Sequence, residues 1–261
     1  MSGLIPLFSR EMKKWYRNPV FLITGLAQPF FWVALFGSAL GKFPSAFLGG
    51  APTYITFIMG GVLTITALFT AMFSGMGLIW DRRLGTLGRF LSSPIRRSSI
   101  VFSKVLSATV RILVQAAILI VAALVIPNGL RFNNGFSGID AVILVTAVIL
   151  ISIIFSSVFT IIAIRVTRWE TVMGIVNLVN LPLMFASYAL FPPAIMEGWI
   201  SKVAEYNPVS WSAEAIRMVI VKGSLSASQW TQVGQWIGAL AVLAAVLIIL
   251  TYYLSEKEIR E

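Results

Sequence analysis

Few residues of this chain are able to do chemistry. It has no Cys and no His, which excludes thiolate nucleophiles, Cys/His zinc or haem ligation and a Ser-His-Asp triad. Residues 37–42 (Gly-Ser-Ala-Leu-Gly-Lys) resemble a phosphate-binding loop, but the glycines stand one residue too close and Phe43 replaces the required Ser or Thr. Asp140 and Glu170 form no paired-carboxylate relay. The sequence thus indicates no nucleotide site, so energy comes from another subunit or the protein is passive.

Uncharged polar side chains stand out within apolar stretches. Thr66, Thr70 and Ser74 recur at four-residue steps, and Asn177 and Asn180 lie three apart. Each set shares one face of a helix, and a polar group in lipid needs a partner. We expect these faces to point inward, either to hydrogen-bond a neighbouring helix or to line a substrate path.

The elements that must hold these residues are membrane helices. The chain of 261 residues is 58% apolar and 11% charged, with a mean hydropathy of +0.89, whereas soluble domains have about 25% charged residues. Six apolar stretches each reach the ~20 residues that cross a ~30 Å hydrocarbon core. We therefore expect an all-α, polytopic fold, one domain over residues 1–261 with six transmembrane helices. The stretches are residues 20–40, 53–79, 105–126, 139–164, 171–191 and 233–254.

Two glycine pairs have the spacing of close helix contacts. Gly37 pairs with Gly41, and Gly234 with Gly238. A GxxxG pair is a weak indication of close approach between helices.

Basic residues predict the orientation of these helices. Lys and Arg number 20 against 10 Asp and Glu, and loops rich in Lys and Arg stay cytoplasmic. With the N-terminus inside, 14 of the 20 fall on the cytoplasmic side and five on the outer side. Six spans then place both termini in the cytoplasm. The excess positive charge is thus expected to set the topology in the lipid bilayer, and no nucleic-acid partner is expected. Charged residues precede the first stretch, which is expected to be an anchor and not a cleaved signal.

Residues 1–19 combine an apolar and a basic face. This pattern is typical of an amphipathic helix in the headgroup plane, and also of a charged flank that only sets topology. Asn18-Pro19 ends the segment, because proline disfavours helical geometry in the residue before it. The apolar positions are Leu4, Leu7, Phe8, Met12 and Trp15, and the basic positions are Arg10, Lys13, Lys14 and Arg17.

The cytoplasmic loop of residues 80–104 is the most informative polar segment. Leucines at helical spacing predict a short amphipathic helix over residues 84–91, ending before Pro94. It is either a contact for another protein or a basic connector against anionic lipid headgroups. Its apolar face holds Leu84, Leu87, Phe90 and Leu91, while Arg82, Arg83 and Arg89 point elsewhere.

Residues 191–232 mix aromatic residues with prolines. Pro192, Pro193 and Pro208 exclude a single spanning helix, whereas the aromatic residues suit the membrane interface. We expect short external re-entrant helices that act as an outer gate, with an exposed Glu214–Arg217 pair worth only a few tenths of a kcal/mol. The gate residues are Trp199, Tyr206, Asn207, Pro208, Trp211, Glu214 and Arg217.

Three motifs together resemble the permease subunit of type-two ATP-binding-cassette exporters, which include the daunorubicin-resistance and nodulation-factor export permeases. Their order and spacing cover nearly the whole chain. Arg83 and Gly88 stand where that family usually has acidic residues, while Asp81 and Arg82 fit. The motifs are Arg10-Glu11 with Arg17-Asn18-Pro19 and Pro29, similar to an interfacial helix entering span one; Gly85-Thr86-Leu87 to Ser93-Pro94, similar to the coupling segment; and Asn207-Pro208 followed by residues 213–217, similar to the external segment before the last span.

The resemblance implies a homodimeric permease with two ATP-binding-cassette ATPase subunits, in the plasma (inner) membrane of a prokaryote. It would move a lipid-like, glycolipid or amphipathic drug substrate outward. The chain itself would be no enzyme and would hold no cofactor, since ATP and Mg would bind the ATPase subunit. Leu87 is expected in the apolar contact with that subunit. The coupling residues implied are Asp81, Arg82, Leu84, Gly85, Thr86, Leu87, Phe90, Leu91 and Pro94.

Two other classes of function stay open. One is a membrane-embedded lipid-modifying enzyme, which the lack of His, Cys and any acidic cluster disfavours. The other is a scaffold subunit for membrane complex assembly. An ATPase gene beside this one would separate the exporter from both.

Overall fold

The apolar runs form helices, which satisfy their own backbone hydrogen bonds where no water is present. The computed structural model describes residues 3–41, 44, 48–126, 129–132, 136–222 and 225–258, without the side chains of residues 19–22 and 24. Across these ranges the chain contains helices, turns and irregular segments but no strand, which confirms the all-α class. Lys42, Phe43 and Arg260 lie outside the described residues.

Four helices are long and apolar enough to cross a membrane: α3 (Tyr54–Arg83), α5 (Arg97–Val125), α6 (Gly138–Arg165) and α10 (Ala227–Glu258). Two more occupy the first and fifth predicted stretches, α2 (Pro19–Ala39) and α7 (Trp169–Phe185). Among the described residues, α7 and the Gly25–Ala39 part of α2 are shorter apolar helices. Four candidate spans are therefore established, and the count of six stays a prediction.

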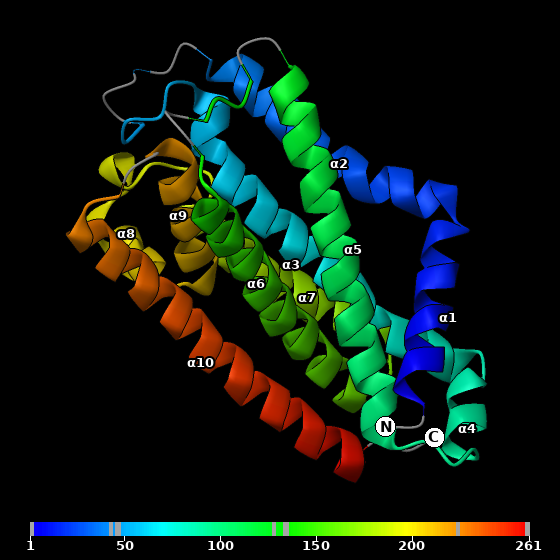
Figure 1. Cartoon of the computed structure of the whole chain (residues 1–261). Helices are drawn as coiled ribbons and strands as arrows, with labels where there is room; N and C mark the ends of the chain where they lie inside the picture. Colours follow the sequence, from blue (N-terminus) through cyan, green and yellow to red (C-terminus); the bar gives the residue numbers. More distant parts are fainter. Residues whose placement is uncertain are drawn as a thin grey trace.

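Short helices lie at both ends of the bundle (Figure 1). The amphipathic segment forms α1 (Leu4–Tyr16), which lies with α4 (Thr86–Leu91) and the two chain ends at one end of the bundle. The 3-10 turn η2 (Pro193–Ile195), α8 (Gly198–Glu205) and α9 (Pro208–Val221) lie away from that end. Short helices are therefore present in these segments, and their interfacial, coupling and external re-entrant roles stay predictions.

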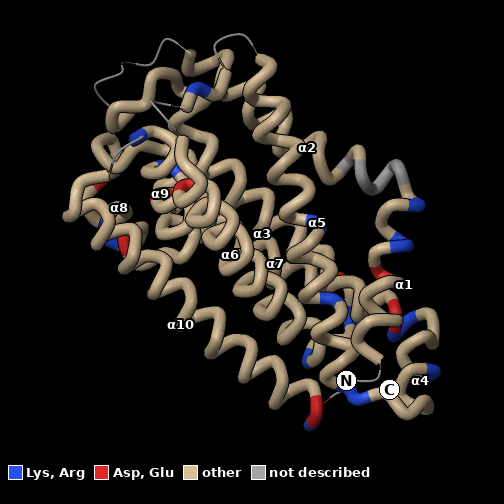
Figure 2. Tube along the Cα trace, viewed as in Figure 1, with Lys and Arg blue, Asp and Glu red and all other residues tan. Residues whose placement is uncertain are grey.

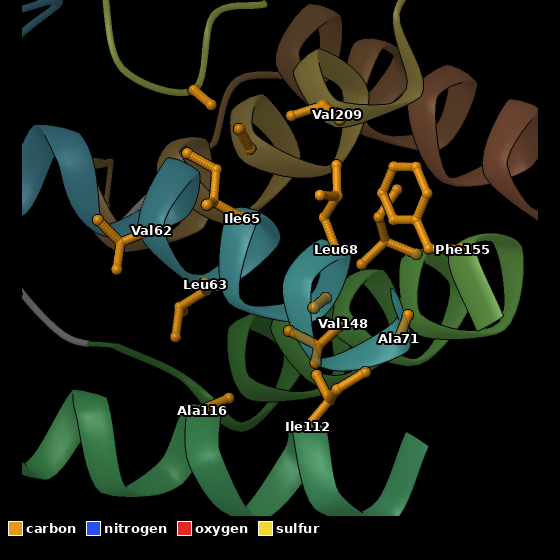
Figure 3. Packing of buried hydrophobic residues seen from close by; sticks show 14 of the residues in the cluster. Val62, Leu63, Ile65, Leu68, Ala71, Ile112, Ala116, Val148, Phe155 and Val209 are labelled. Carbon is orange, nitrogen blue, oxygen red and sulfur yellow. The ribbon is translucent and has the colours of Figure 1, made fainter. Parts of the chain in front are cut away.

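The buried helix α3 is the one around which the others pack. It contacts α2, α5, α6 and α9, whereas most of α10 remains exposed on the outside of the bundle. Figure 3 shows Leu63 and Leu68 of α3 among side chains of its neighbours, such as Ile112 of α5 and Phe155 of α6. The residues on α3 thus sit at the centre of the molecule.

Glycines on α3 allow this close packing. A Cβ at Gly61 would lie 1.8 Å from the carbonyl oxygen of Ala189, and one at Gly75 would lie 2.6 Å from that of Phe159. Real Cβ atoms essentially never come within 3.0 Å of such atoms. Backbone meets backbone at both places, so a side chain here would force the helices apart.

The predicted glycine pairs behave differently from one another. A Cβ at Gly37 would meet the Ile55 side chain at 2.7 Å, so this position is a close contact. No described atom lies within 4 Å of a Cβ built at Gly234 or Gly238. The expected close approach at that second pair is therefore wrong within this chain, because α10 turns these glycines away from its neighbours.

We expect Gly75→Ala to destabilise the bundle by about 1–3 kcal/mol, because its methyl group overlaps the α6 backbone. Gly234→Ala is the matched control, and it should be neutral or slightly stabilising, since alanine favours a helix and the site is open. Thermal unfolding of both purified variants in detergent, followed by circular dichroism, measures the difference. Equal melting temperatures would contradict the close approach of α3 and α6.

Candidate functional site

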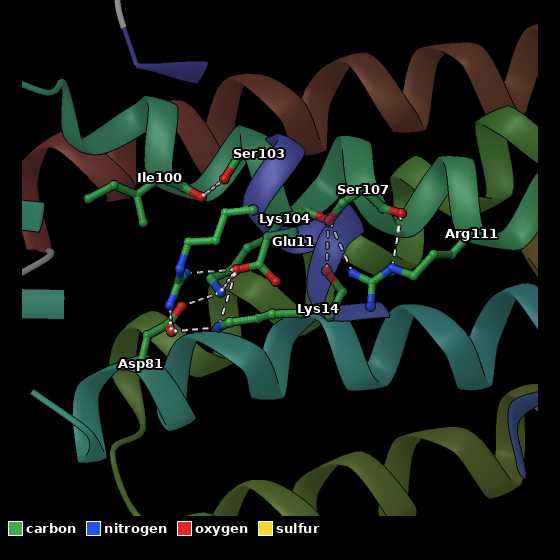
Figure 4. Close-up of polar contacts among 10 residues, drawn as sticks. Glu11, Lys14, Asp81, Ile100, Ser103, Lys104, Ser107 and Arg111 are labelled. Carbon is green, nitrogen blue, oxygen red and sulfur yellow. Dashed lines mark hydrogen bonds and ion pairs between the residues drawn. The ribbon is translucent and has the colours of Figure 1, made fainter. Parts of the chain in front are cut away.

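A group of charged side chains with a buried centre, here the charged cluster, joins α1, α3 and α5 (Figure 4). It consists of Arg10, Glu11, Lys14, Asp81 and Lys104. Lys104, whose side chain is 3% exposed, donates to Asp81 Oδ2 at 2.6 Å and to Glu11 Oε1 at 3.4 Å. Arg10 and Lys14 donate to Asp81 Oδ1 at 3.2 and 3.3 Å. Each of the three helices contributes at least one charge.

Local sequence explains how these charges meet. Residues 10, 11 and 14 share one face of α1, Asp81 lies in the last turn of α3, and α5 begins at Arg97, so Lys104 lies inside a helix. A buried charge is costly unless paired. The charged cluster therefore holds α1 in one position against α3 and α5.

Sequence reasoning missed Glu11 and Lys104 as partners. It assigned Lys104 to the end of a polar loop, because the apolar run starts only at residue 105. One signal was available: Glu11 is the sole acidic residue before Asp81. An isolated carboxylate beside a basic stripe suggests a specific ionic partner.

The predicted coupling helix is shorter than expected. Gly85 adopts φ 66° and ψ 5°, a left-handed conformation that ends α3 and starts α4 at Thr86, so Leu84 precedes the helix. The Arg10 guanidinium lies 4.9 Å from the centre of the Phe90 ring. This cation–π contact joins α4 to the charged cluster.

The predicted coupling residues face in different directions. Asp81 belongs to the charged cluster, and Arg82 donates to the carbonyl oxygen of Ala163 at 3.2 Å. Leu87 is 1% exposed and packs in the core of this chain, whereas Leu84 is 70% exposed. Leu87 therefore packs inside this chain, and its expected contact with an ATPase subunit stays a prediction. Among the remaining residues, Gly85 and Pro94 are exposed and Thr86, Phe90 and Leu91 are half-buried.

The α3 hydroxyls make helix contacts, and two of them line a cavity. Thr70 Oγ1 donates to Gln115 Oε1 at 2.7 Å, Ser74 Oγ donates to the Lys104 carbonyl at 2.9 Å, and Thr66 bonds its own helix at Val62. Thr66, Thr70 and Gln115 also line a cavity of about 220 Å³. Gln115 of α5, a single amide in an apolar stretch, was missed by the sequence reasoning. The other lining residues are Gly25, Gln28, Pro29, Phe69 and Phe73.

Asn177 and Asn180 of α7 have different surroundings. Asn180 is buried and its Nδ2 lies 3.6 Å from Met72 Sδ of α3, while its Oδ1 has no partner among the described residues. Asn177 is exposed, next to exposed Leu178. The structure therefore does not bring these amides together on one inward face.

Arg217 anchors α9 to the centre of the bundle. Its Nε donates to the Phe57 carbonyl at 2.8 Å, its Nη2 donates to the Tyr188 carbonyl at 2.7 Å, and its guanidinium lies 3.8 Å from the Phe57 ring centre. It also pairs with Glu214. The expected exposed Glu214–Arg217 pair is wrong in its exposure, because α9 packs against α3 and buries the arginine.

Asn207 connects the outer segment to the end of α7. Its Nδ2 donates to the carbonyls of Leu183 and Ala186 at 2.9 and 2.8 Å, and its Oδ1 accepts from Val209 N–H. This bonding accounts for the end of α7 at Phe185, before the apolar run ends. Of the other predicted gate residues, Trp199 and Tyr206 are exposed, Pro208 starts α9 and Trp211 Nε1 donates to the Glu205 carbonyl at 2.7 Å.

We expect Asp81→Asn to cost about 3–5 kcal/mol of stability, because it leaves buried Lys104 with only the longer ion pair to Glu11, at 3.4 Å. Combining Asp81→Leu with Lys104→Met should restore much of the loss, since both charges are then removed together. Arg83→Gln is the control, because its pair with exposed Glu170, at 3.8 Å, is worth less than about 1 kcal/mol. Thermal unfolding in detergent tests all three, and equal losses for Asp81→Asn and Arg83→Gln would refute the assigned role.

Comparisons with known proteins agree with this arrangement. Residues 4–221, from α1 to the end of α9, match the family described as ABC-2 type transporter. The daunorubicin resistance ABC transporter permease protein DrrB1 of Streptomyces coeruleorubidus is 28% identical over 217 residues, which cover 83% of this chain and 74% of the relative. The ycf38 transport permease of Porphyra purpurea is 29% identical over 214 residues, 82% and 72% of the two chains. DrrC of Mycobacterium tuberculosis, named for doxorubicin resistance, is 23% identical over 244 residues, 94% and 86%.

The family match covers the charged cluster, α4 and the Arg217 anchor in one continuous stretch. It confirms the resemblance found from the coupling and external motifs. This chain therefore belongs to the ABC-2 type transporter family and is a membrane permease of an ABC transporter.

Proposed function

We propose that the chain forms a homodimer that exports a lipid-like, glycolipid or amphipathic drug substrate, driven by two ATP-binding-cassette ATPase subunits that bind ATP and Mg. The observation that carries the proposal is the joining of α4 to the membrane helices. Gly85 connects α4 directly to α3, and Phe90 contacts Arg10 of the charged cluster. A displacement of α4 by an ATPase would move α1, α3 and α5 together, because separating them unpairs buried charges.

The charge distribution supports a cytoplasmic position for this end of the bundle. Figure 2 shows basic residues on α1 and around α4, close to both chain ends. Segments rich in Lys and Arg remain cytoplasmic. ATP is cytoplasmic, so a coupling contact belongs on that side. The proposed location is the inner membrane of a prokaryote, with both termini in the cytoplasm.

The cavity beside Thr70 and Gln115 supports an amphipathic substrate. Its phenylalanine rings provide apolar contact, and the hydroxyls and amides provide a few fixed hydrogen bonds, as is usual in small-molecule sites. Its volume of about 220 Å³ is below the usual range of about 300–1,000 Å³. We propose that it is one part of a path completed in the dimer, where exposed Asn177 and Leu178 of α7 would face the second copy. The names of DrrB1 and DrrC, which refer to drug resistance, are consistent with such a substrate.

The contacts of residues 191–232 support a gate in which one helix, α9, is fixed and another, α8, is able to move. Asn207 and Arg217 hold α9 against α7 and α3 through backbone carbonyls, whereas α8 presents exposed Trp199 and Tyr206. Tryptophan and tyrosine prefer the membrane interface. In this proposal α8 moves over the end of the path while α9 stays in place.

We expect Leu84→Asp to abolish both co-purification with the ATPase subunit and transport, because a charge enters the proposed apolar contact. The melting temperature of the permease should stay unchanged, since Leu84 is exposed. Leu87→Asp should instead reduce the yield of folded permease by burying a charge within this chain. Val203→Asp on exposed α8 is the matched control and should keep the ATPase. Full co-purification and transport by Leu84→Asp would count against α4 as the coupling element.

Single cysteines in this naturally Cys-free chain test the orientation. A membrane-impermeant maleimide should label Lys202→Cys on α8 in intact cells and Arg89→Cys on α4 only after lysis. Both native side chains are exposed, whereas Ser210 is buried and unsuitable. The opposite labelling pattern would overturn the orientation. Labelling of half-buried Ser201→Cys should change when vanadate blocks ATP turnover, and an unchanged rate would remove the case for a moving gate.

A further inference from the structure

A second cavity, of about 320 Å³, lies beside the charged cluster between α1, α3 and α5. Charged residues and indole rings line it together, including Lys14, Trp15, Trp80 and Arg111. It is separate from the cavity at Gln115, with which it shares only Phe73. The remaining lining residues are Glu11, Asn18, Phe73, Ser74, Met76 and Gly77.

Arg111 is a buried cation that forms no direct ion pair with any side chain in the described part of the chain. It is 7% exposed, and its Nε and Nη2 donate to the carbonyl and hydroxyl oxygens of Ser107 on its own helix, both at 3.0 Å (Figure 4). Among the described side chains, no carboxylate lies within 4.0 Å of this guanidinium. Glu11, the acidic group of the cavity, is already shared by Arg10, Lys14 and Lys104.

The immediate surroundings carry an excess of positive charge. Among the described residues here, four cations, of which Lys14 is half exposed, lie near two carboxylates, and a charge in a membrane protein normally has a partner. An anion in the cavity would balance the excess. The cations are Arg10, Lys14, Lys104 and Arg111, and the carboxylates are Glu11 and Asp81.

Trp15 provides an independent indication. It is 8% exposed and lines the cavity, yet its Nε1–H is buried without an acceptor among the described residues. Buried indole N–H groups usually have a hydrogen-bond partner. A bound group with acceptor oxygens would accept from this indole N–H and from the Arg111 guanidinium, whose bonds to Ser107 use only Nε and Nη2.

We propose that this cavity binds the phosphate of an anionic phospholipid headgroup. Phosphate oxygens match the planar fork of Arg111 and accept from Trp15 Nε1–H. Half-exposed Trp80 marks a position at headgroup depth, where tryptophan is enriched. Basic pockets between membrane helices on the cytoplasmic side bind such headgroups. Phe73 and Met76 offer apolar contact to the glycerol and upper acyl chain.

A lipid bound here would contact all three helices that the charged cluster joins. It would stabilise the docked position of α1 in addition to the ion pairs, so the stability of the protein would depend on the anionic lipid content of the membrane. This inference goes beyond the proposed export function, because binding requires neither an ATPase nor a transported substrate.

The test is a lipid titration of the full-length chain in dodecylmaltoside, with unfolding followed by circular dichroism. Dioleoylphosphatidylglycerol should raise the melting temperature saturably, and dioleoylphosphatidylcholine should raise it less. In Arg111→Gln the half-maximal phosphatidylglycerol concentration should rise by about tenfold or more, since a charged hydrogen-bonded contact is lost. Arg168→Gln removes the same charge from an exposed position at the start of α7, and its titration should match the wild type.

Two milder variants keep the test decisive if Arg111→Gln does not fold. Trp15→Phe keeps a ring but removes the donor, and Arg111→Lys keeps the charge but removes the fork; each should weaken the lipid effect by about threefold to tenfold. Equal effects of the two lipids, or equal titrations for the Arg111 variants and Arg168→Gln, would overturn the proposal.

Inorganic phosphate distinguishes the source of the anion. Phosphate that raises the wild-type melting temperature and competes with phosphatidylglycerol would identify a general phosphate site. A lipid effect that excess phosphate does not reduce would identify the phospholipid, which is the expected result because the acyl chain adds apolar contact.

Discussion

A lysine and an aspartate buried side by side impose the constraint on which the rest of the structure depends. Lys104 and Asp81 approach to 2.6 Å with almost no exposure, and loss of either side chain would take the shortest ion pair from a buried charge. Glu11 ties α1 into the same contact. The amphipathic helix α1 is thereby attached to α3 and α5, and Arg10 extends the attachment to Phe90 of α4.

Away from the charged cluster, the helices are held together by close packing at glycines and by hydrogen bonds from side chains to backbone carbonyl oxygens. Gly61 and Gly75 let the backbones at Ala189 and Phe159 touch α3. Asn207 binds the Leu183 carbonyl oxygen near the end of α7, and Arg217 binds the carbonyl oxygens of Phe57 in α3 and of Tyr188 in the turn after α7. The helices thus pack tightly around α3, whereas apolar side chains on the outer face of α10 are exposed.

This division suits a transporter subunit. The helices α4 and α1, which an ATPase would displace in the proposed mechanism, are connected to α3 through the charged cluster. At the other end, the exposed helix α8 precedes α9, which is held by more contacts. The polar cavity at Gln115 lies beside α3, within reach of such a movement. The charged cluster also creates the surplus of cations for which a phospholipid phosphate is the proposed partner.

The sequence by itself determined the class of the protein: helical, membrane-embedded, without Cys or His chemistry, and with coupling and external motifs in the order of one transporter family. Hydropathy and motif spacing depend only on residues that are near one another in the sequence, so the sequence alone is enough to recognise them. Tertiary structure decided which face of each helix meets which neighbour. It turned Leu87 inward and Leu84 outward, separated Asn177 from Asn180 and buried Arg217. The pairing of Lys104 with Asp81 and of Gln115 with Thr70 is visible only in the tertiary structure. Such pairs depend on how helices far apart in the sequence pack together, and not on spacing along the chain.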